Sequence, residues 1–287
     1  GLMMLEILKA ILFGIVEGIT EWIPVSSTGH MILLEEFVSF SEDAVSEGFF
    51  QMFEVVIQLG AILAVAILFW NRLFPFYLGK KAEEKGYVVR RNVLELWLKI
   101  LVACVPAAVV GILLDDWIDA HLYNGTVVAV MLIVVGIAFI VIEQFNPNKK
   151  AKIRRVREIT YKTALIIGLF QVIAAVLPGT SRSGATIIGA MLIGVSRPVA
   201  AEFTFYLAIP VMFGASLLKI IKFGLHFTGM ETAILLTGMI TAFVVSFFVI
   251  GFFLDYIRKH DFRAFGWYRI ALGVIVLIYF AVKAAAG

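Results

Sequence analysis

Six long, largely apolar runs dominate the sequence and restrict the folds that are open to it. About 20 apolar residues in a helix span the hydrocarbon core of a bilayer, and in lipid only helices and closed barrels satisfy every backbone hydrogen bond. Apolar residues make up 61% of the chain and charged residues 16%, far from the composition of soluble domains. The sequence therefore predicts an all-α polytopic membrane protein. The expected spans are residues 50–70, 94–114, 126–145, 199–221, 231–256 and 267–282.

Two further apolar segments are interrupted by short polar motifs. The first segment has arms at residues 5–23 and 31–40, and the second has arms at residues 163–177 and 185–195. A helix of about 10 residues rises about 15 Å, half of a hydrocarbon core of about 30 Å. We therefore predict that each segment is a re-entrant helical hairpin whose tip holds the polar residues. The first arm is long enough to span, so a full crossing there stays open.

The first polar motif, GIVEGITEWIPVSSTGH, occupies residues 14–30. Glu17 and Glu21 are four residues apart and share one helix face, and Gly14 and Gly18 have the spacing of close helix packing. Ionisable residues at the centre of a membrane helix cost about 2.5–3.5 kcal/mol each on insertion scales, which favours a functional role for the two acids. Pro24 ends the helical run, and the next helix start offers free amides to an anion. The candidate residues after Pro24 are Ser26, Ser27, Thr28 and His30.

A second motif, GLFQVIAAVLPGTSRSG at residues 168–184, matches the first at an offset of 154. The first motif carries acids and the second carries a permanent positive charge. This complementary charge indicates that the two motifs meet in the fold. We expect Arg182 to lie about one side chain away from Ser27 and Glu21. The alignment pairs Gly14 with Gly168, Glu17 with Gln171, Pro24 with Pro178, Ser26 with Thr180, Ser27 with Ser181 and Thr28 with Arg182.

Each half of the chain thus has one hairpin and three spans. An odd number of crossings inverts the second half relative to the first, which is the inverted-repeat plan of many transporters, with a site between the halves near mid-membrane. We predict a single integral membrane domain over residues 1–287, with repeat 1 at about 4–145 and repeat 2 at about 162–284.

Loop charges predict the orientation, because cytoplasmic loops carry an excess of Lys and Arg. The basic loops fall on one side of the predicted topology and the acidic loops on the other. The first hairpin then enters from the outer face, and the site should open outward. The basic loops are residues 71–93, 146–162 and 257–265, and the acidic loops are residues 41–47 and 115–119.

The acids and hydroxyls of the first motif admit several chemical roles. Glu17 and Glu21 suit a divalent cation, Mg²⁺ or Ca²⁺, which prefers carboxylate oxygens and bridges to phosphate. Either acid could instead be a general base or a structural acid bonded to backbone. Ser27 could be an activated nucleophile, with Ser26 as its rival, or both could only cap the helix. His30 could move a proton or simply satisfy a hydrogen bond.

The second motif suits an anion. Arg182 lies between Ser181 and Ser183 at a predicted helix start, and a guanidinium with hydroxyl neighbours binds phosphate oxygens in a bidentate manner. The alternative is an arginine that extends its charge to the membrane interface. We include Thr180 in this set, and Gln58 as a polar group that either lines the cavity or joins two helices.

Three motifs resemble those of the undecaprenyl-pyrophosphate phosphatase family, the bacterial bacitracin-resistance proteins: EGITEWIPVSSTGH, EVVIQLGAILAV and PGTSRSGATIIGAMLIGVSR. The resemblance covers nearly the whole chain. It implies a multi-pass enzyme of the bacterial inner membrane that removes one phosphate from a C55 lipid pyrophosphate and so recycles the lipid carrier of cell-wall synthesis. The functional positions that it implies are Glu17, Glu21, Ser27, His30 and Arg182.

The mechanism that we expect is attack by Ser27 on the terminal phosphorus, with Glu21 or His30 taking the proton; direct attack by water is the alternative. The partners are then the polyprenyl pyrophosphate and membrane lipids, with no nucleic acid, and a homodimer stays open. The competing class is a secondary transporter or lipid flippase, which the inverted repeat suggests. A structural scaffold would explain none of the paired motifs.

Overall fold

The computed structural model describes residues 1–145 and 150–287, and within these ranges the chain is helical with no β-strand. Among the described residues, six helical segments are long and apolar enough to cross a bilayer, which confirms the predicted polytopic membrane protein. They are α3 with α4 (Phe49–Val56 and Gln58–Leu68), α7 (Arg91–His121), α8 (Gly125–Phe145), α11 (Arg197–Phe223), α12 (Gly229–Lys259) and α13 (Arg263–Ala286).

The remaining helices are shorter and include those that flank the polar motifs. α1 (Leu2–Thr20) leads into α2 (Ser27–Phe37), and α9 (Tyr161–Val176) leads into α10 (Arg182–Leu192). We call residues 21–26 the first turn and residues 177–181 the second turn. Both motifs thus lie where one helix stops and a short helix starts. The other short elements are α5 (Trp70–Leu73), α6 (Lys80–Lys85) and the 3₁₀ helix η1 (Val156–Glu158).

Helix α7 extends further than the sequence pattern predicts. Asp115, Asp116 and Asp119, expected in an acidic turn, belong to its last helical turns, so that expectation is wrong. Two lysines of α11 form ion pairs with these aspartates and offset their negative charge. Lys222 Nζ lies 2.6 Å from an oxygen of Asp115 and 3.2 Å from one of Asp116, and Lys219 Nζ lies 3.5 Å from one of Asp119. Because these charges are paired with a neighbouring helix, the backbone stays helical through them.

The first predicted span is also less regular than expected. It is interrupted at Ile57, which separates α3 from α4 and puts Gln58 at the first position of α4. Close packing accompanies the break, because a Cβ added at Gly60 would lie 1.9 Å from the carbonyl oxygen of Met239 on α12. Only a glycine lets α4 approach α12 so closely.

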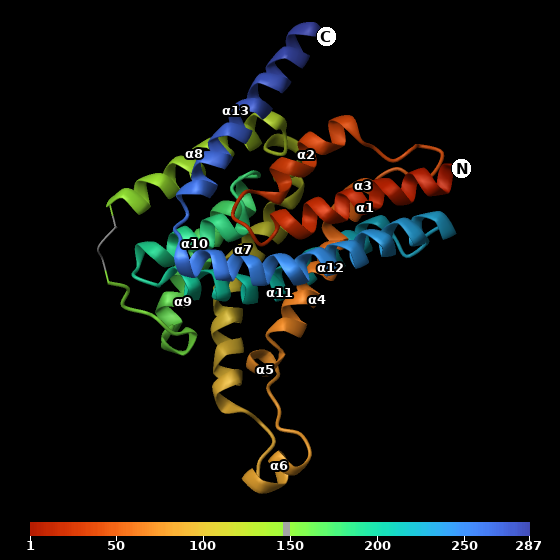
Figure 1. Ribbon diagram of the computed structural model, residues 1–287. Helices are drawn as coiled ribbons and strands as arrows, with labels where there is room; N and C mark the ends of the chain where they lie inside the picture. The colour runs from red at the N-terminus through yellow and green to blue at the C-terminus, as the bar shows by residue number, and fades with distance from the viewer. Residues whose placement is uncertain (146–149) are drawn as a thin grey trace.

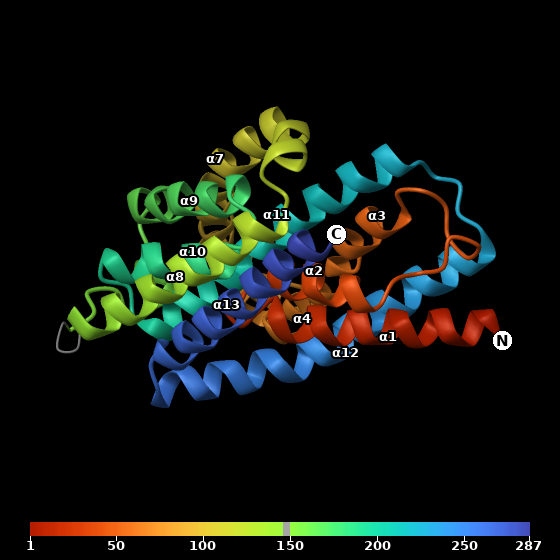
Figure 2. The same ribbon diagram turned by 90° about the horizontal axis from the view of Figure 1, so that it is seen from above.

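Helices distant in sequence lie side by side (Figures 1 and 2). α1 packs along α12, α9 along α7, and α8 along α13. A Cβ added at Gly14 would lie 2.7 Å from Cβ of Thr241 on α12, and one added at Gly168 would lie 2.2 Å from the carbonyl oxygen of Ala103 on α7. Gly18 meets Val245 in the same way, so the predicted close-packing role of Gly14 and Gly18 is confirmed.

The buried centre is formed by α10 and α11. Every residue from Ser183 to Met191 in α10 is buried, as is every residue from Val199 to Ala208 in α11. The outer spans instead expose large apolar side chains such as Phe248 and Phe252 of α12. This is the distribution expected of a bundle that faces lipid, and it places the second turn inside the protein.

The predicted basic loop of residues 146–162 is only partly described, since residues 146–149 lie outside the described residues. From Lys150 onward it runs beside the end of α10. Side chains of this loop, of the segment between α4 and α7, and of the end of α12 line one cavity. The three basic segments are therefore on the same end of the molecule, as the charge pattern predicts.

Candidate active site

The first turn begins with Glu21, which caps the end of α1, and ends with the buried Ser26. Ser26 has φ 70° and ψ 101°, and its Oγ accepts a hydrogen bond from the amide of Gly29 at 3.1 Å. Ser26 is thus the N-cap of α2, and Ser27 is the first helical residue. Ser26 and Ser27 therefore have different roles, because the side chain of Ser26 already caps α2.

The second turn has the same construction. Ser181 has φ 74° and ψ 125°, and its Oγ accepts from the amide of Gly184 at 3.0 Å. Ser26 and Ser181 are the only non-glycine residues with positive φ in the described ranges. Such strain persists only where the surrounding structure enforces it, and it concentrates at functional sites.

This backbone match corrects the predicted alignment of the two motifs. Ser26, not Ser27, corresponds to Ser181, because the second turn has one more residue between its proline and its capping serine. Ser27 therefore corresponds to Arg182, the first residue of α10. Equivalent positions at two helix starts thus carry a hydroxyl in one half and a guanidinium in the other.

The starts of α2 and α10 meet at Glu21. Ser27 Oγ donates to one carboxylate oxygen, Oε2, at 3.0 Å, and Nη2 of Arg182 lies 3.7 Å from the other, Oε1. Ser183 Oγ also donates to the main-chain oxygen of Glu21 at 3.5 Å. The predicted approach of Arg182 to Glu21 is confirmed.

Arg182 uses only part of its hydrogen-bond donors in the described part of the chain. Its side chain is only 10% exposed, and its Nη1 donates to the carbonyl oxygen of Thr204 on α11 at 2.7 Å. Nε and Nη2 have no hydrogen-bond partner in the described part of the chain. A buried guanidinium with unused donors suits a phosphate oxyanion.

Glu17 lies one helical turn before Glu21, and both residues are buried. Oε1 of Glu17 is buried without a hydrogen-bond partner among the described residues. Within residues 1–145 and 150–287 no group of three or more His, Cys, Asp or Glu side chains could hold a metal ion. A cation here would have two protein carboxylates and would take its other ligands from phosphate and water, which is common for Mg²⁺.

The predicted hydroxyl residues are not equally placed. Ser181 and Ser183 lie with their Oγ atoms 3.0 Å apart beside Arg182, whereas the hydroxyl of Thr180 donates at 2.7 Å to Leu177 O within its own turn. Thr28 is half-buried in the first turn of α2. Gln58 is half-buried at the start of α4, and no hydrogen bond joins its side chain to these groups in the described ranges.

His30 lies on α2 but is not bonded to Ser27. Its Nδ1 is 2.8 Å from the carbonyl oxygen of Ser26, and its Nε2 is 2.6 Å from the hydroxyl of Tyr268 on α13, against which the ring stacks. A carbonyl oxygen only accepts, so in the neutral ring Nδ1 donates and Nε2 accepts from Tyr268. Both ring nitrogens are occupied, and the group that contacts the Ser27 hydroxyl is Glu21.

Arg269 of α13 is not among the site residues predicted from the sequence. Its side chain donates hydrogen bonds to the backbone of both turns. Its fully buried guanidinium donates to Pro24 O of the first turn at 3.1 Å, and to Gly179 O and Thr180 O of the second turn at 2.8 and 3.0 Å. Further bonds reach Met131 O and Leu132 O of α8. An arginine inside a predicted apolar span was the signal that would have identified it.

The fold and this site define a polytopic helical membrane protein in which two buried, strained turns bring a serine, two carboxylates and an arginine together. The family model of the bacitracin resistance protein BacA matches residues 10–275, and the chain belongs to that family. It is 58% identical to an undecaprenyl-diphosphatase of Desulfitobacterium hafniense, over 99% of both chains. It is 59% identical to undecaprenyl-diphosphatase 1 of Clostridium acetobutylicum, over 97% of this chain and 98% of the relative.

Proposed function

We propose that this chain is an undecaprenyl-diphosphatase. It hydrolyses C55 polyprenyl pyrophosphate to the monophosphate and inorganic phosphate, recycles the lipid carrier of the cell wall and thereby gives bacitracin resistance. The observation that carries the proposal is the contact of Ser27 and Arg182, from the separate starts of α2 and α10, with the one carboxylate of Glu21. The names of the relatives support it independently, since they match over almost the whole chain.

In the reaction that we propose, Glu21 takes the proton of Ser27 Oγ while Oγ attacks the terminal phosphorus. The Oγ–P bond forms as the bond from that phosphorus to the bridging oxygen breaks, and the polyprenyl monophosphate leaves. Water then displaces Oγ from the phosphoserine and releases inorganic phosphate. The hydrogen bond of 3.0 Å from Ser27 to Glu21 supports Glu21 over His30 as the base. Direct attack by water on the substrate is the alternative.

Arg182 would bind the oxygens of the transferred phosphoryl group. Phosphoryl transfer depends mainly on positioning and charge stabilisation, and two donor atoms of Arg182, Nε and Nη2, make no hydrogen bond to the described residues. The hydroxyls of Ser181 and Ser183 and the first amides of α2 and α10 add neutral donors around the same space. Ser26 supports the site through its cap, and Thr28 lies one residue beyond Ser27 on the same helix start.

We further propose that Glu17 and Glu21 hold a divalent cation, Mg²⁺ or Ca²⁺. Their carboxyl groups are buried one helical turn apart, and Oε1 of Glu17, which has no hydrogen-bond partner in the described part of the chain, suits such an ion. When bound, the cation would neutralise phosphate charge and polarise the phosphoryl oxygens. Arg182 would remain the protein's own positive charge at the site.

An inverted repeat of two re-entrant hairpins, each followed by three spans, is the architecture that we propose around this site. It is supported by reciprocal packing, since α1 packs along α12 while its counterpart α9 packs along α7, the counterpart of α12. The matching strained serines, Ser26 and Ser181, support it as well. The repeats would cover about residues 4–145 and 162–284 of a single membrane domain.

The enzyme would lie in the bacterial inner membrane with its basic segments in the cytoplasm and its site open to the outer, periplasmic face. The shared cavity of the three basic segments supports this orientation, because basic loops remain on the cytoplasmic side. The lipid substrate would then present its pyrophosphate from outside.

Phosphate release from C55 pyrophosphate by the purified protein in detergent, with Mg²⁺ or Ca²⁺ added, tests the proposed function. A transporter or flippase would release none, because transport breaks no phosphoanhydride bond. Ser27→Ala should abolish release and the phosphoserine that acid quenching traps at position 27. Ser39→Ala, which alters an exposed serine outside the site, is the matched control. Near-normal turnover of Ser27→Ala would refute the serine nucleophile and favour direct attack by water.

A further inference from the structure

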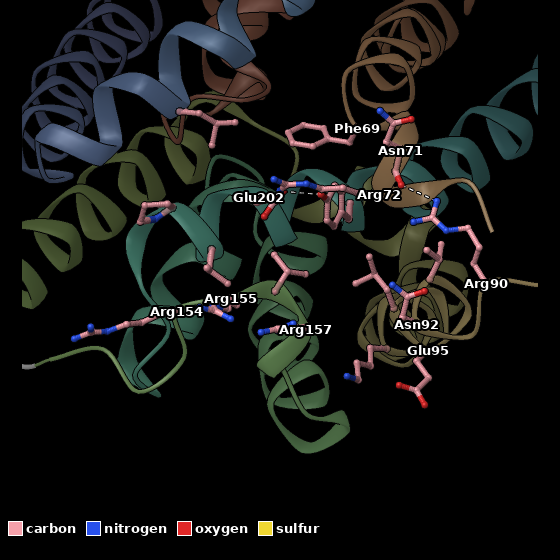
Figure 3. A pocket seen from close by; sticks show the side chains of 18 of the residues that line it. Phe69, Asn71, Arg72, Arg90, Asn92, Glu95, Arg154, Arg155, Arg157 and Glu202 are labelled. Carbon is pink, nitrogen blue, oxygen red and sulfur yellow. Dashed lines mark hydrogen bonds and ion pairs between the residues drawn. The ribbon is translucent and has the colours of Figure 1, made fainter. Parts of the chain in front are cut away.

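A second concentration of positive charge lies away from the candidate active site. A cavity of about 700 Å³ is lined by seven lysine and arginine side chains and only two acids, Glu95 and Glu202. In Figure 3, Arg154, Arg155 and Arg157 lie to one side and Arg90 to the other, with Arg72 and Glu202 above them in the view. None of the candidate active-site residues lines this cavity. It is therefore a separate site.

The segment that carries three of these arginines is held in place. The amide of Ile153 donates to Gly194 O at 3.1 Å, and Ile153 O accepts from the amide of Ser196 at 2.9 Å. Ile159, just beyond the arginines, is fully buried. Because both ends of this short segment are fixed, Arg155 and Arg157 are presented at a defined place.

Much of the positive charge is left uncompensated. Arg72 pairs with Glu202, which also accepts from the hydroxyl of Tyr206. Arg155 and Arg157 make no salt bridge within residues 1–145 and 150–287. Mutual repulsion of such groups in a concave space is relieved when an anion enters.

The N-termini of two helices add to the positive electrostatic potential in this cavity. α7 and α11 have 31 and 27 residues, and neither N-cap, Arg90 or Ser196, makes a side-chain capping bond. Their first residues, among them Asn92 and Val199, line the cavity. The positive ends of both helix dipoles and their free amides therefore face the same space as the guanidinium groups.

A neighbouring cavity of about 740 Å³ extends the same basic surface. It shares Arg154, Pro198 and Arg258 with the first cavity and adds Lys150 and Lys259 to its lining. Basic residues that served only to orient the chain in the membrane would need no shared concave surface. Their convergence on adjoining cavities indicates recognition of an anion.

We propose that this cavity is a second phosphate-binding site, which takes either the phosphate of an anionic lipid headgroup or free inorganic phosphate. Planar guanidinium groups match phosphate oxygens in a bidentate manner, and several of them converge here. The volume suits a headgroup-sized ligand rather than a polymer. Leu96 and Leu254 in the lining offer apolar contacts to the glycerol and first methylenes of a lipid.

The test compares Arg155→Gln/Arg157→Gln with Lys80→Gln/Lys81→Gln. Both double variants remove the same charge from exposed residues, but Lys80 and Lys81 of α6 lie outside the cavity lining. Native mass spectrometry of each purified protein in detergent measures binding of phosphatidylglycerol, with phosphatidylcholine as the zwitterionic reference. Isothermal titration calorimetry measures binding of inorganic phosphate, the soluble source of the anion.

The cavity variant should bind phosphatidylglycerol, inorganic phosphate or both at least tenfold more weakly than the wild type, and the α6 variant should stay within twofold. Loss in the lipid arm alone identifies a headgroup as the ligand, and loss in the phosphate arm alone identifies the free anion. Arg155→Lys/Arg157→Lys, which keeps the charge but not the planar fork, should recover only part of the affinity. Equal binding by the cavity and α6 variants in both arms would overturn the proposal.

Discussion

Arg182 combines burial with hydrogen-bond donors that no described residue uses, an arrangement that costs stability unless a ligand uses them. Arg182→Lys keeps the charge but loses the planar fork, so the loss of a charged hydrogen bond, about 1.5–3 kcal/mol, should lower kcat/KM roughly 10- to 100-fold. The rate of phosphate release from the lipid pyrophosphate measures this change in kcat/KM. Arg263→Lys, at a half-exposed arginine paired with Asp261, should be unaffected. An Arg182→Lys enzyme with most of its activity would exclude bidentate phosphate binding.

Arg269 acts through the backbone of both turns rather than through a reacting atom. In Arg269→Lys a single ammonium group cannot reach carbonyls of both turns, and each buried carbonyl left unsatisfied costs about 1–3 kcal/mol. We expect a lower unfolding temperature together with a lower kcat at temperatures where the variant is still folded. Thermal unfolding and steady-state kinetics measure these effects. An altered unfolding temperature with an unchanged kcat would assign Arg269 to stability alone.

At the scale of helices, close packing of α1 on α12 places Glu17 and Glu21. Gly14→Ala would put Cβ 2.7 Å from Cβ of Thr241, and overpacking of this kind typically costs about 1–3 kcal/mol. We expect a lower unfolding temperature and reduced activity, because α1 must shift. Gly251→Ala on α12 is the control, since nothing lies within 4 Å of its added Cβ and alanine favours a helix. Equal behaviour of the two variants would mean that α1 adjusts without strain.

The six spans and the meeting of the two motifs were predictable, because apolar length and complementary charge are properties of the sequence itself. The extension of α7 through Asp115 was not, because it depends on Lys222 of a helix more than 100 residues away. The correspondence of Ser26 with Ser181 depends on backbone dihedrals, which an alignment by residue type cannot register. Arg269 stands out in the sequence as an arginine inside an apolar span, but its partners were not predictable, because its acceptors are carbonyl oxygens, which carry no sequence signature.

For the whole molecule, the proposed orientation follows from where the basic segments gather. The segment between α4 and α7, the segment before α9 and the end of α12 contribute to one cavity, so they share a side of the membrane. Glu47 lies on the acidic segment between α2 and α3, across the span formed by α3 and α4 from the first basic segment. Under the proposed orientation, the positive-inside rule predicts that Glu47 lies outside and Lys152 in the cytoplasm.

Cysteine labelling tests this orientation directly. Cys104 is buried and is the single cysteine of the chain, so Cys104→Ala gives a background without thiols. Glu47→Cys and Lys152→Cys each place one thiol at an exposed position. In intact cells an impermeant thiol reagent should label position 47 and leave position 152 unlabelled, and permeabilised cells should label both. Labelling of position 152 alone in intact cells would invert the topology, and with it the outward opening of the site that holds Ser27.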